Sequence, residues 1–219
     1  MNHETSKRLF NYWNTIRGER IAPRRFDVEP GRLGNILPDT FILERNASGA
    51  FVYRLAGTRL CEGMGTDLKG RDFLEAVNAA DRATLEPQLG AVVAKGAVLL
   101  QVLEIETSCG GLGLVEVLLL PLTHSREAIE RFLGCIVWLD APPPLREHSI
   151  VAKRLKSHKL IWPAGGPIDP PEKPAYRPVE AGHQAPFPAH IRHSRIVRQE
   201  RRQFRVYDGG LSKSPLDKH

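Results

Sequence analysis

Long apolar segments are absent from this sequence. A helix that crosses a bilayer needs about 20 predominantly apolar residues, and the longest apolar run, 112–122, is interrupted by Glu116 and Pro121. Residues 1–8 are polar and lack the apolar stretch of a secretory signal. We therefore predict a cytoplasmic protein with no transmembrane segment.

Cysteine is scarce as well. The chain has three cysteines, Cys61, Cys109 and Cys135, and their spacing matches no metal-binding motif. An odd number of cysteines does not fit a disulfide framework, and disulfides are rare in the cytoplasm. We therefore expect reduced thiols and no metal bound through cysteine.

Patterns that would indicate catalysis are also missing. Serine and histidine never combine in a nucleophile-elbow pattern, and Gly63-x-Gly65 lacks the third glycine and the lysine of a phosphate-binding loop. The carboxylate pair of Asp81 and Glu86 fits a solvated position. Glu104 and Glu106 lie on the same face of one predicted strand, which indicates an exposed or partner-facing side of a sheet. We predict that the protein is not an enzyme.

The charge of the chain is unevenly distributed. Hydrophobic residues make up 42% and charged residues 26% of the sequence, as in soluble globular proteins. Residues 1–144 contain 16 Lys and Arg against 18 Asp and Glu, whereas residues 145–219 contain 15 against 7. The second part also holds 9 of the 17 prolines. We therefore predict a domain boundary at residue 144.

The first segment with a clear period is 6–17. Its apolar residues are spaced by three or four, the pattern of one helix face, and they are Leu9, Tyr12, Trp13 and Ile16. This stripe is more apolar than a short surface helix normally exposes. We predict a helix that either caps the domain or builds a homodimer.

The next part of the chain is typical of strands separated by turns and short helices. The predicted strands are Thr40–Arg45, Ala50–Ala56, Ala97–Thr107, Leu112–Leu122 and Arg131–Leu139. The predicted helices are a short one between Pro30 and Pro38 and a longer one at Ala79–Lys95, and Glu147–Lys159 at the start of the C-terminal part could form a further helix. No regular helical crossover of the kind that parallel strands require separates these strands. We predict an α+β fold with a five-stranded antiparallel sheet and helices on one face.

The C-terminal part is predicted to be a largely irregular basic tail. Residues 162–189 contain eight prolines in 28 residues and cannot form a core of their own. Arginines then recur at short intervals, at Arg192, Arg195, Arg198, Arg201, Arg202 and Arg205. Such a strip could neutralise phosphates on nucleic acid, meet an anionic membrane surface, or pair with the acidic surface of the domain itself. Because no cysteine lies near His183, His190 and His193, we expect no metal site in the tail.

Several motifs accompany this order of elements, namely Tyr53–Leu60, Gly63-Met64-Gly65, Leu68–Phe73, Asp81-Arg82 and Glu116–Leu122. Together, the order and the motifs resemble the PAS domain family over roughly residues 8–142. More narrowly, Tyr12-Trp13, Leu37–Phe41 and Tyr207–Gly210 resemble a branch of single-domain PAS proteins common in alphaproteobacteria.

This resemblance implies signal reception, ligand binding or protein pairing, since PAS domains share a shape and not a reaction. It places an N-terminal helix and linker at 1–30, the PAS-like domain at 31–144 and the basic tail at 145–219. With no output domain attached, we expect a sensory or interaction regulator that acts through a signalling protein partner. The alternative is a nucleic-acid-binding regulator that uses the arginine-rich tail.

The resemblance also implies where a ligand would bind. A small apolar ligand would occupy a pocket between the sheet and the helices. The predicted lining residues, which could equally be ordinary core, are Phe41, Leu43, Tyr53, Leu55, Phe73, Leu118 and Cys135.

Neither of the coloured cofactors known in PAS domains is expected. Light-sensing members use a cysteine in an Asn-Cys-Arg-Phe-type motif, and the surroundings of Cys61 lack that asparagine and the following Arg-Phe. Haem-binding members need an axial histidine, but no histidine occurs between Phe10 and Leu120, and His124 lies past the fourth predicted strand. We therefore predict a colourless protein without flavin or haem.

Overall fold

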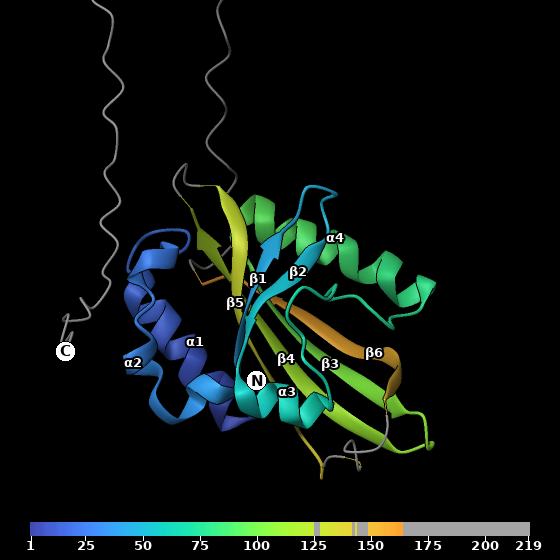
Figure 1. The fold of residues 1–219 in the computed structure, drawn as a ribbon. Coiled ribbons are helices and arrows are strands. Elements are labelled where there is room, and N and C mark those ends of the chain that lie inside the picture. Colours follow the sequence, from blue (N-terminus) through green and yellow to red (C-terminus); the bar gives the residue numbers. More distant parts are fainter. Residues whose placement is uncertain (125–127, 142, 144–148, 164–219) are drawn as a thin grey trace, which may run out of the picture. The chain divides into compact units, whose positions relative to one another are not determined.

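The computed structural model describes residues 1–124, 128–141, 143 and 149–163. Within these residues, strands form one antiparallel sheet in the order β2-β1-β5-β4-β3-β6 (Figure 1). The strands are β1 (Thr40–Arg45), β2 (Phe51–Ala56), β3 (Val98–Thr107), β4 (Leu112–Thr123), β5 (Ile129–Trp138) and β6 (Ile150–Ile161). The helices are α1 (Glu4–Arg17), η1 (Arg25–Asp27), α2 (Pro30–Leu33), η2 (Gly34–Asp39), α3 (Thr58–Met64) and α4 (Ala79–Lys95).

The sheet has one strand more than predicted. The α+β class and the antiparallel pairing are confirmed, and the five predicted strands are present as β1 to β5. The predicted helix at 147–159 is wrong, because residues 150–159 belong to strand β6, which pairs with β3. Pairing with the open edge of β3 outweighs local propensity here. The sheet therefore continues past the predicted boundary at residue 144.

Helices α3 and α4 cover one face of the sheet, and the N-terminal helix α1, which the sequence predicts as a cap or a dimer helix, covers the other face together with α2. In β4, Val117 and Leu119 belong to a core shared with α3 and α4, while Leu118 and Leu120 belong to a second core shared with α1 and α2. Figure 1 shows α1 and α2 side by side, away from α4. Because successive strand residues point to opposite faces, a strand with both faces covered is a continuous apolar run, as β4 is.

Helix α1 closes one face of the sheet. It begins after His3, whose Nδ1 accepts a hydrogen bond from the Thr5 backbone N–H at 3.1 Å. Leu9 and Trp13 are 0% exposed, and Trp13 Nε1 donates to the Pro121 carbonyl at 2.8 Å. Tyr12 and Ile16 pack against the same core and are partly buried. The four predicted stripe residues therefore contact the sheet of their own chain.

A buried carboxylate fixes the start of α1. Glu116 of β4 is 0% exposed, and its two oxygens accept hydrogen bonds from the backbone N–H groups of Asn2 at 2.7 Å and His3 at 3.2 Å. A negative group is favourable beside a helix N-terminus. Glu116 therefore places the helix on the sheet, a role that was not visible in the sequence.

One glycine permits a close approach at the centre of the sheet. Gly134 of β5 is the register partner of Phe41 in β1. A Cβ atom added at Gly134 would lie 2.2 Å from Phe41 Cζ and 2.6 Å from the Leu118 carbonyl oxygen. The Phe41 ring therefore occupies the space that a side chain at residue 134 would need.

Candidate ligand site

An open cavity of about 440 Å³ lies on the side of the sheet that α3 and α4 cover. Its walls come from β2, the end of α3, the segment 65–78 that joins α3 to α4, the β3–β4 turn and the start of β6. Small-molecule sites commonly have volumes of this order. The cavity is therefore the candidate ligand site.

The segment 65–78 is held between two strands. On one side it pairs with β2, where the Tyr53 N–H donates to the Arg71 carbonyl at 3.0 Å and the Gly70 N–H donates to the Tyr53 carbonyl at 2.8 Å. On the other side, the Lys153 N–H of β6 donates to the Ala76 carbonyl at 2.8 Å. Ala76 adopts a φ of 63°, which is uncommon for a residue other than glycine. These bonds fix the wall of the cavity.

Lys153 is the unusual residue of the cavity. It is 8% exposed, and the structure gives its ammonium group no hydrogen bond or ion pair within the described part of the chain. Burial lowers the pKa of Lys153 from 10.5 to about 8, although the negative charges of Glu75 and Asp72 act in the opposite direction. Lysine is almost never buried without a partner.

The two carboxylates of the cavity are engaged by arginines. Asp72 lies 3.5 Å from Arg82, and Glu75 lies 3.6 Å from Arg71. Asp72 also accepts a hydrogen bond from the Leu74 N–H at 3.0 Å. Both carboxylates are therefore paired with arginines and not with Lys153.

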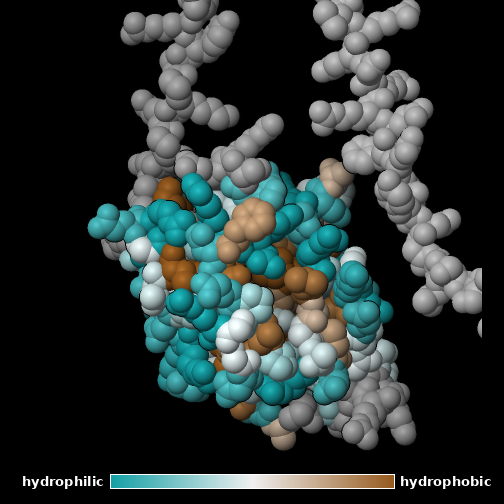
Figure 2. All heavy atoms as spheres, turned by 60° about the vertical axis from the view of Figure 1, so that its left-hand side comes forward, coloured by the Kyte–Doolittle hydropathy of each residue, from teal (hydrophilic) through white to brown (hydrophobic). Residues whose placement is uncertain are grey.

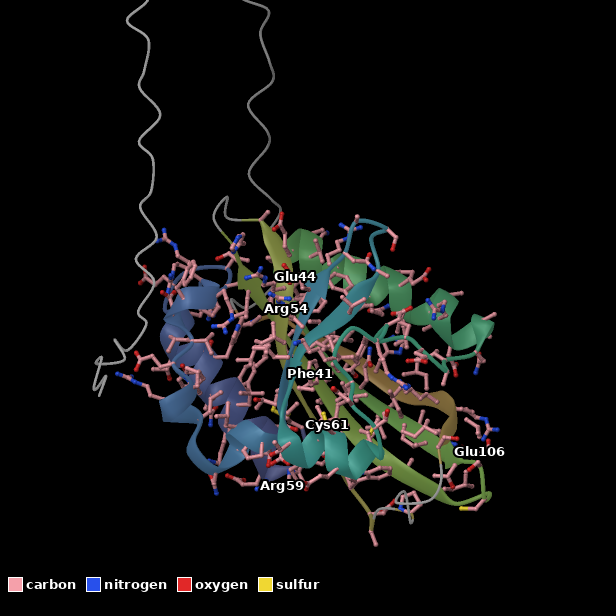
Figure 3. All side chains as sticks on the ribbon, in the orientation of Figure 1. Phe41, Glu44, Arg54, Arg59, Cys61 and Glu106 are labelled. Carbon is pink, nitrogen blue, oxygen red and sulfur yellow. The ribbon has the colours of Figure 1, made fainter. Side chains whose placement is uncertain are left out.

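Tyr53 connects the cavity to the aromatic core. Its ring lies 5.4 Å from the Phe41 ring and 6.0 Å from the Phe73 ring, measured between centroids. Burial raises the pKa of Tyr53 above its ordinary value, so the hydroxyl stays protonated and can donate a hydrogen bond. Phe41 lies among the inner side chains, above Cys61 of α3 in the view of Figure 3.

The structure divides the predicted pocket residues among three places. Phe41, Leu43, Tyr53 and Phe73 share the core next to α3 and α4, and of these Tyr53 lines the cavity. Leu118 and Cys135 belong to the opposite core, beneath α1. Leu55 is 52% exposed. These seven residues therefore do not surround one pocket.

Cys135 occupies a closed position beneath α1. Its Sγ atom lies 3.6 Å from Ser6 Oγ, and burial raises the pKa of the thiol to about 12. A buried thiol of this kind is inert at neutral pH. Cys61 is partly buried and Cys109 is exposed, and all three cysteines are free.

Leu55 belongs to a second hollow, an apolar groove of about 260 Å³ beside β2. Its apolar lining includes Val28, Pro30, Leu33, Leu37 and Leu55. Phe26, next to the lining residue Arg25, is 82% exposed. Figure 2, which turns the α1–α2 side forward, shows hydrophobic residues gathered among hydrophilic ones on this side.

The acidic residues singled out in the sequence form ion pairs. Glu104 and Glu106 form ion pairs with Arg154 and Lys156 of β6, with Glu104 3.3 Å from Lys156 and Glu106 2.5 Å from Arg154. Figure 3 shows Glu106 at the end of the sheet farthest from Glu44 and Arg54. Surface pairs of this type contribute about 0–1 kcal/mol each.

The other predicted carboxylate pair belongs to α4. Asp81 accepts a hydrogen bond from the Leu155 N–H at 2.9 Å and so links the start of α4 to β6. Glu86 lies 3.9 Å from Arg82.

The predicted basic strip lies outside the described residues. It consists of Arg192, Arg195, Arg198, Arg201, Arg202 and Arg205. Over the part of the chain that is described, no three His, Cys, Asp or Glu side chains are grouped to hold a metal ion. In that same part, no helix combines the length and the apolar character needed to cross a membrane.

Sequence reasoning missed Lys153 because the residue was assigned to the tail. In the structure, Lys153 and Leu155 lie across from Ile105 and Leu103, while Arg154 between them lies across from Glu104. The apolar residues of 150–161 do not alternate along the sequence, so the segment has no period of two that would predict a strand.

Comparison with known proteins gives one family match. A family model described as PAS domain matches residues 1–137. No curated protein matches the chain.

Several solved structures are similar at low identity. The LOV protein of Rhodobacter sphaeroides is 15% identical, with a TM-score of 0.39 over 47% of this chain and 59% of that one. The PAS domain of a protein from Colwellia psychrerythraea is 12% identical, with a TM-score of 0.37 over 46% and 86%. A sensory box histidine kinase/response regulator from Burkholderia thailandensis is 18% identical, with a TM-score of 0.33 over 51% and 85%. The chain thus spans about three fifths of the LOV protein.

Proposed function

The chain belongs to the PAS domain family, and on this premise we propose that it is a regulator that binds a small ligand and acts through a partner protein. Family membership supports a sensory or regulatory role. The observation that carries the ligand part of the proposal is the cavity of about 440 Å³. Membership of the single-domain branch remains a prediction.

We propose that the protein works by binding and not by catalysis. The cavity combines one buried amine with hydroxyl groups, and its carboxylates Asp72 and Glu75 are engaged by arginines. Such groups can orient a ligand, whereas a general base must be unprotonated, and with a pKa of about 8 Lys153 is mainly protonated at pH 7. We place this role in the cytoplasm, in keeping with the three free thiols.

The apolar groove beside β2 is the surface that we assign to the partner protein. Exposed apolar patches on soluble domains commonly mark interaction sites. Leu55 and Phe26 are 52% and 82% exposed, and Leu37 is 39% exposed.

Cross-linking of the tagged full chain in its own cells, followed by mass spectrometry, tests this proposal. We expect one protein to be recovered in stoichiometric amount by the wild type and lost with Leu55→Asp. The control is Leu112→Asp, because Leu112 is equally exposed, at 57%, but lies on β4 away from the groove. Recovery that is unchanged by Leu55→Asp, or no recovery at all, would contradict the proposed partner surface.

Nucleic-acid binding through the tail is the second candidate function. The excess of 15 Lys and Arg over 7 Asp and Glu in residues 145–219 favours it. We expect binding of this kind to weaken steeply with salt, because released counterions drive it. Fluorescence anisotropy of a labelled nucleic acid tests it. The nucleic acid is titrated with the full chain and, separately, with a chain ending at residue 163, each at two salt concentrations.

A further inference from the structure

We propose that the cavity at Lys153 binds a small organic carboxylate, with the Lys153 ammonium as its main anchor. This inference rests on the proposed function, because it names the chemical class of the ligand. It involves β6, which lies beyond the residues 1–137 that match the family model.

The first observation is a buried cation in need of a partner. Lys153 is 8% exposed and lines the cavity. Removing an ammonium group from water is costly unless a counter-charge and hydrogen bonds compensate for it. Within the described part of the chain the Lys153 ammonium forms no hydrogen bond or ion pair, and the carboxylates of Glu75 and Asp72 act on it only without direct contact, so an anion from outside could supply the missing contact.

The second observation is that the nearby carboxylates are occupied. Asp72 and Glu75 influence Lys153 electrostatically, but each is bound by an arginine, at 3.5 Å and 3.6 Å. Arg71 is itself a lining residue and adds a second positive charge. Among the charged lining residues, which number two positive and two negative, Lys153 is the one without an ion pair in the described part of the chain, so the position beside it favours an anion.

The remaining walls define the rest of the ligand. The hydroxyl-bearing residues Tyr53, Ser108 and Ser149 line the cavity and can donate hydrogen bonds to a carboxylate. Met64, Leu68 and Ile150 form apolar wall. A carboxylate with an apolar body fits this combination better than an inorganic anion, which has no apolar surface to bury.

The test compares acids with their neutral amides. The probes are butanoate, hexanoate, octanoate and phenylacetate, together with the four corresponding amides. Each is titrated into the full chain by calorimetry and by NMR, with the amide signals of Ser108 and Lys153 as local reporters. We expect at least one acid to bind at least tenfold more tightly than its amide and to shift both reporters.

Matched variants assign the preference to one side chain. Lys153→Met keeps most of the side-chain length and removes the charge, and we expect it to abolish the preference for the acid. Lys156→Met is the control, because Lys156 lies on the same strand in an exposed ion pair with Glu104, and we expect it to bind as the wild type does. Thermal unfolding verifies that both variants are folded. Lys153→Arg, which retains the charge, provides a second reading if Lys153→Met is not folded, and we expect it to keep a preference for the acid.

Two results would overturn the inference. One is equal binding of acids and amides. The other is no binding of any of the four acids up to about 10 mM, which is weaker than useful recognition. If no acid binds but Leu55→Asp still abolishes partner recovery, only the carboxylate site is wrong. If an acid binds but no partner is recovered, the proposed partner is wrong and the carboxylate site stands.

Discussion

The face of the sheet beneath α1 encloses Leu9 and Trp13, both 0% exposed, whereas the face beneath α3 and α4 leaves a cavity of about 440 Å³ beside Lys153. The first face is closed by one amphipathic helix, and the Trp13 indole N–H has a partner at 2.8 Å. The second is covered by a winding segment with an open hollow and a buried charge. Both faces belong to the same strands.

The two faces of the sheet therefore differ in role: the closed face stabilises the fold, and the face with the cavity holds the proposed ligand site. Close packing with satisfied polar groups favours a single stable state. A cavity that holds an unpaired charge costs stability, and such costs are commonly found where a protein binds its ligand. We therefore expect changes beneath α1 to destabilise the fold, and changes at Lys153 to stabilise it.

The largest expected effect comes from removing β6. A chain ending at residue 149 loses the pairing of β6 with β3 and one wall of the cavity. At about 1 kcal/mol for each net backbone hydrogen bond, we expect a loss of about 5 kcal/mol or more. Urea unfolding followed by circular dichroism measures it. The control ends at residue 163 and keeps β6, and equal stability of the two chains would show that β6 is not part of the folded unit.

Trp13→Ala tests the face beneath α1. Loss of a fully buried aromatic side chain costs about 3–5 kcal/mol, so we expect that decrease in the free energy of unfolding without any change in molecular mass. Light scattering gives the mass. If α1 instead builds a homodimer, the same variant would be a folded monomer with unchanged thermal unfolding, and a role as a cap on its own sheet would be excluded.

Lys153→Met tests the opposite face of the sheet. Its expected effect on the free energy of unfolding has the opposite sign to that of Trp13→Ala. A pKa lowered from 10.5 to about 8 means that burial favours the neutral amine by about 3 kcal/mol. At pH 7 we therefore expect the variant to be more stable than the wild type by about this amount. Arg71, Asp72, Glu75 and Tyr53 are the other titratable or charged groups facing the cavity, and both proteins contain them.

The pH dependence of this difference follows from proton linkage. Between about pH 8 and 10.5 the unfolded chain binds a proton at Lys153 that the folded chain has lost, so wild-type stability rises with pH over this interval. Below pH 8, Lys153 is charged in the folded chain and its destabilising effect on the wild type is fully present. The advantage of Lys153→Met should therefore shrink from pH 8 to pH 10.5 in denaturant titrations. An advantage that does not vary with pH would mean that the charge is not its origin.

The smallest effect is expected at the ion pairs of β3 and β6. Arg154 forms ion pairs with Glu104 and Glu106, and its side chain is 48% exposed. Pairs this exposed contribute about 0–1 kcal/mol, so Arg154→Ala should change the free energy of unfolding by less than about 1 kcal/mol. A larger loss in urea unfolding would show that these pairs hold β6 in place.

Local patterns account for what the sequence predicted well. The apolar run in 112–122 and the three- and four-residue spacing of Leu9, Trp13 and Ile16 are properties of neighbouring residues, and they predicted β4 and α1 within two residues at each end. The predicted pocket was less successful. Leu118 and Cys135 are apolar strand residues like Leu43, but they point to the other face of the sheet.

The sequence by itself determined the PAS family, the first five strands and the buried stripe of α1, because each depends on local periodicity or motif order. Only the tertiary structure decided that both faces are covered, that 150–161 is a sixth strand and that Lys153 is buried. Alternation shows that residues point to opposite faces, but not which helix covers each face. The partner of an edge strand and the burial of a lysine depend on segments far apart in the chain, here β3, β6 and the segment 65–78.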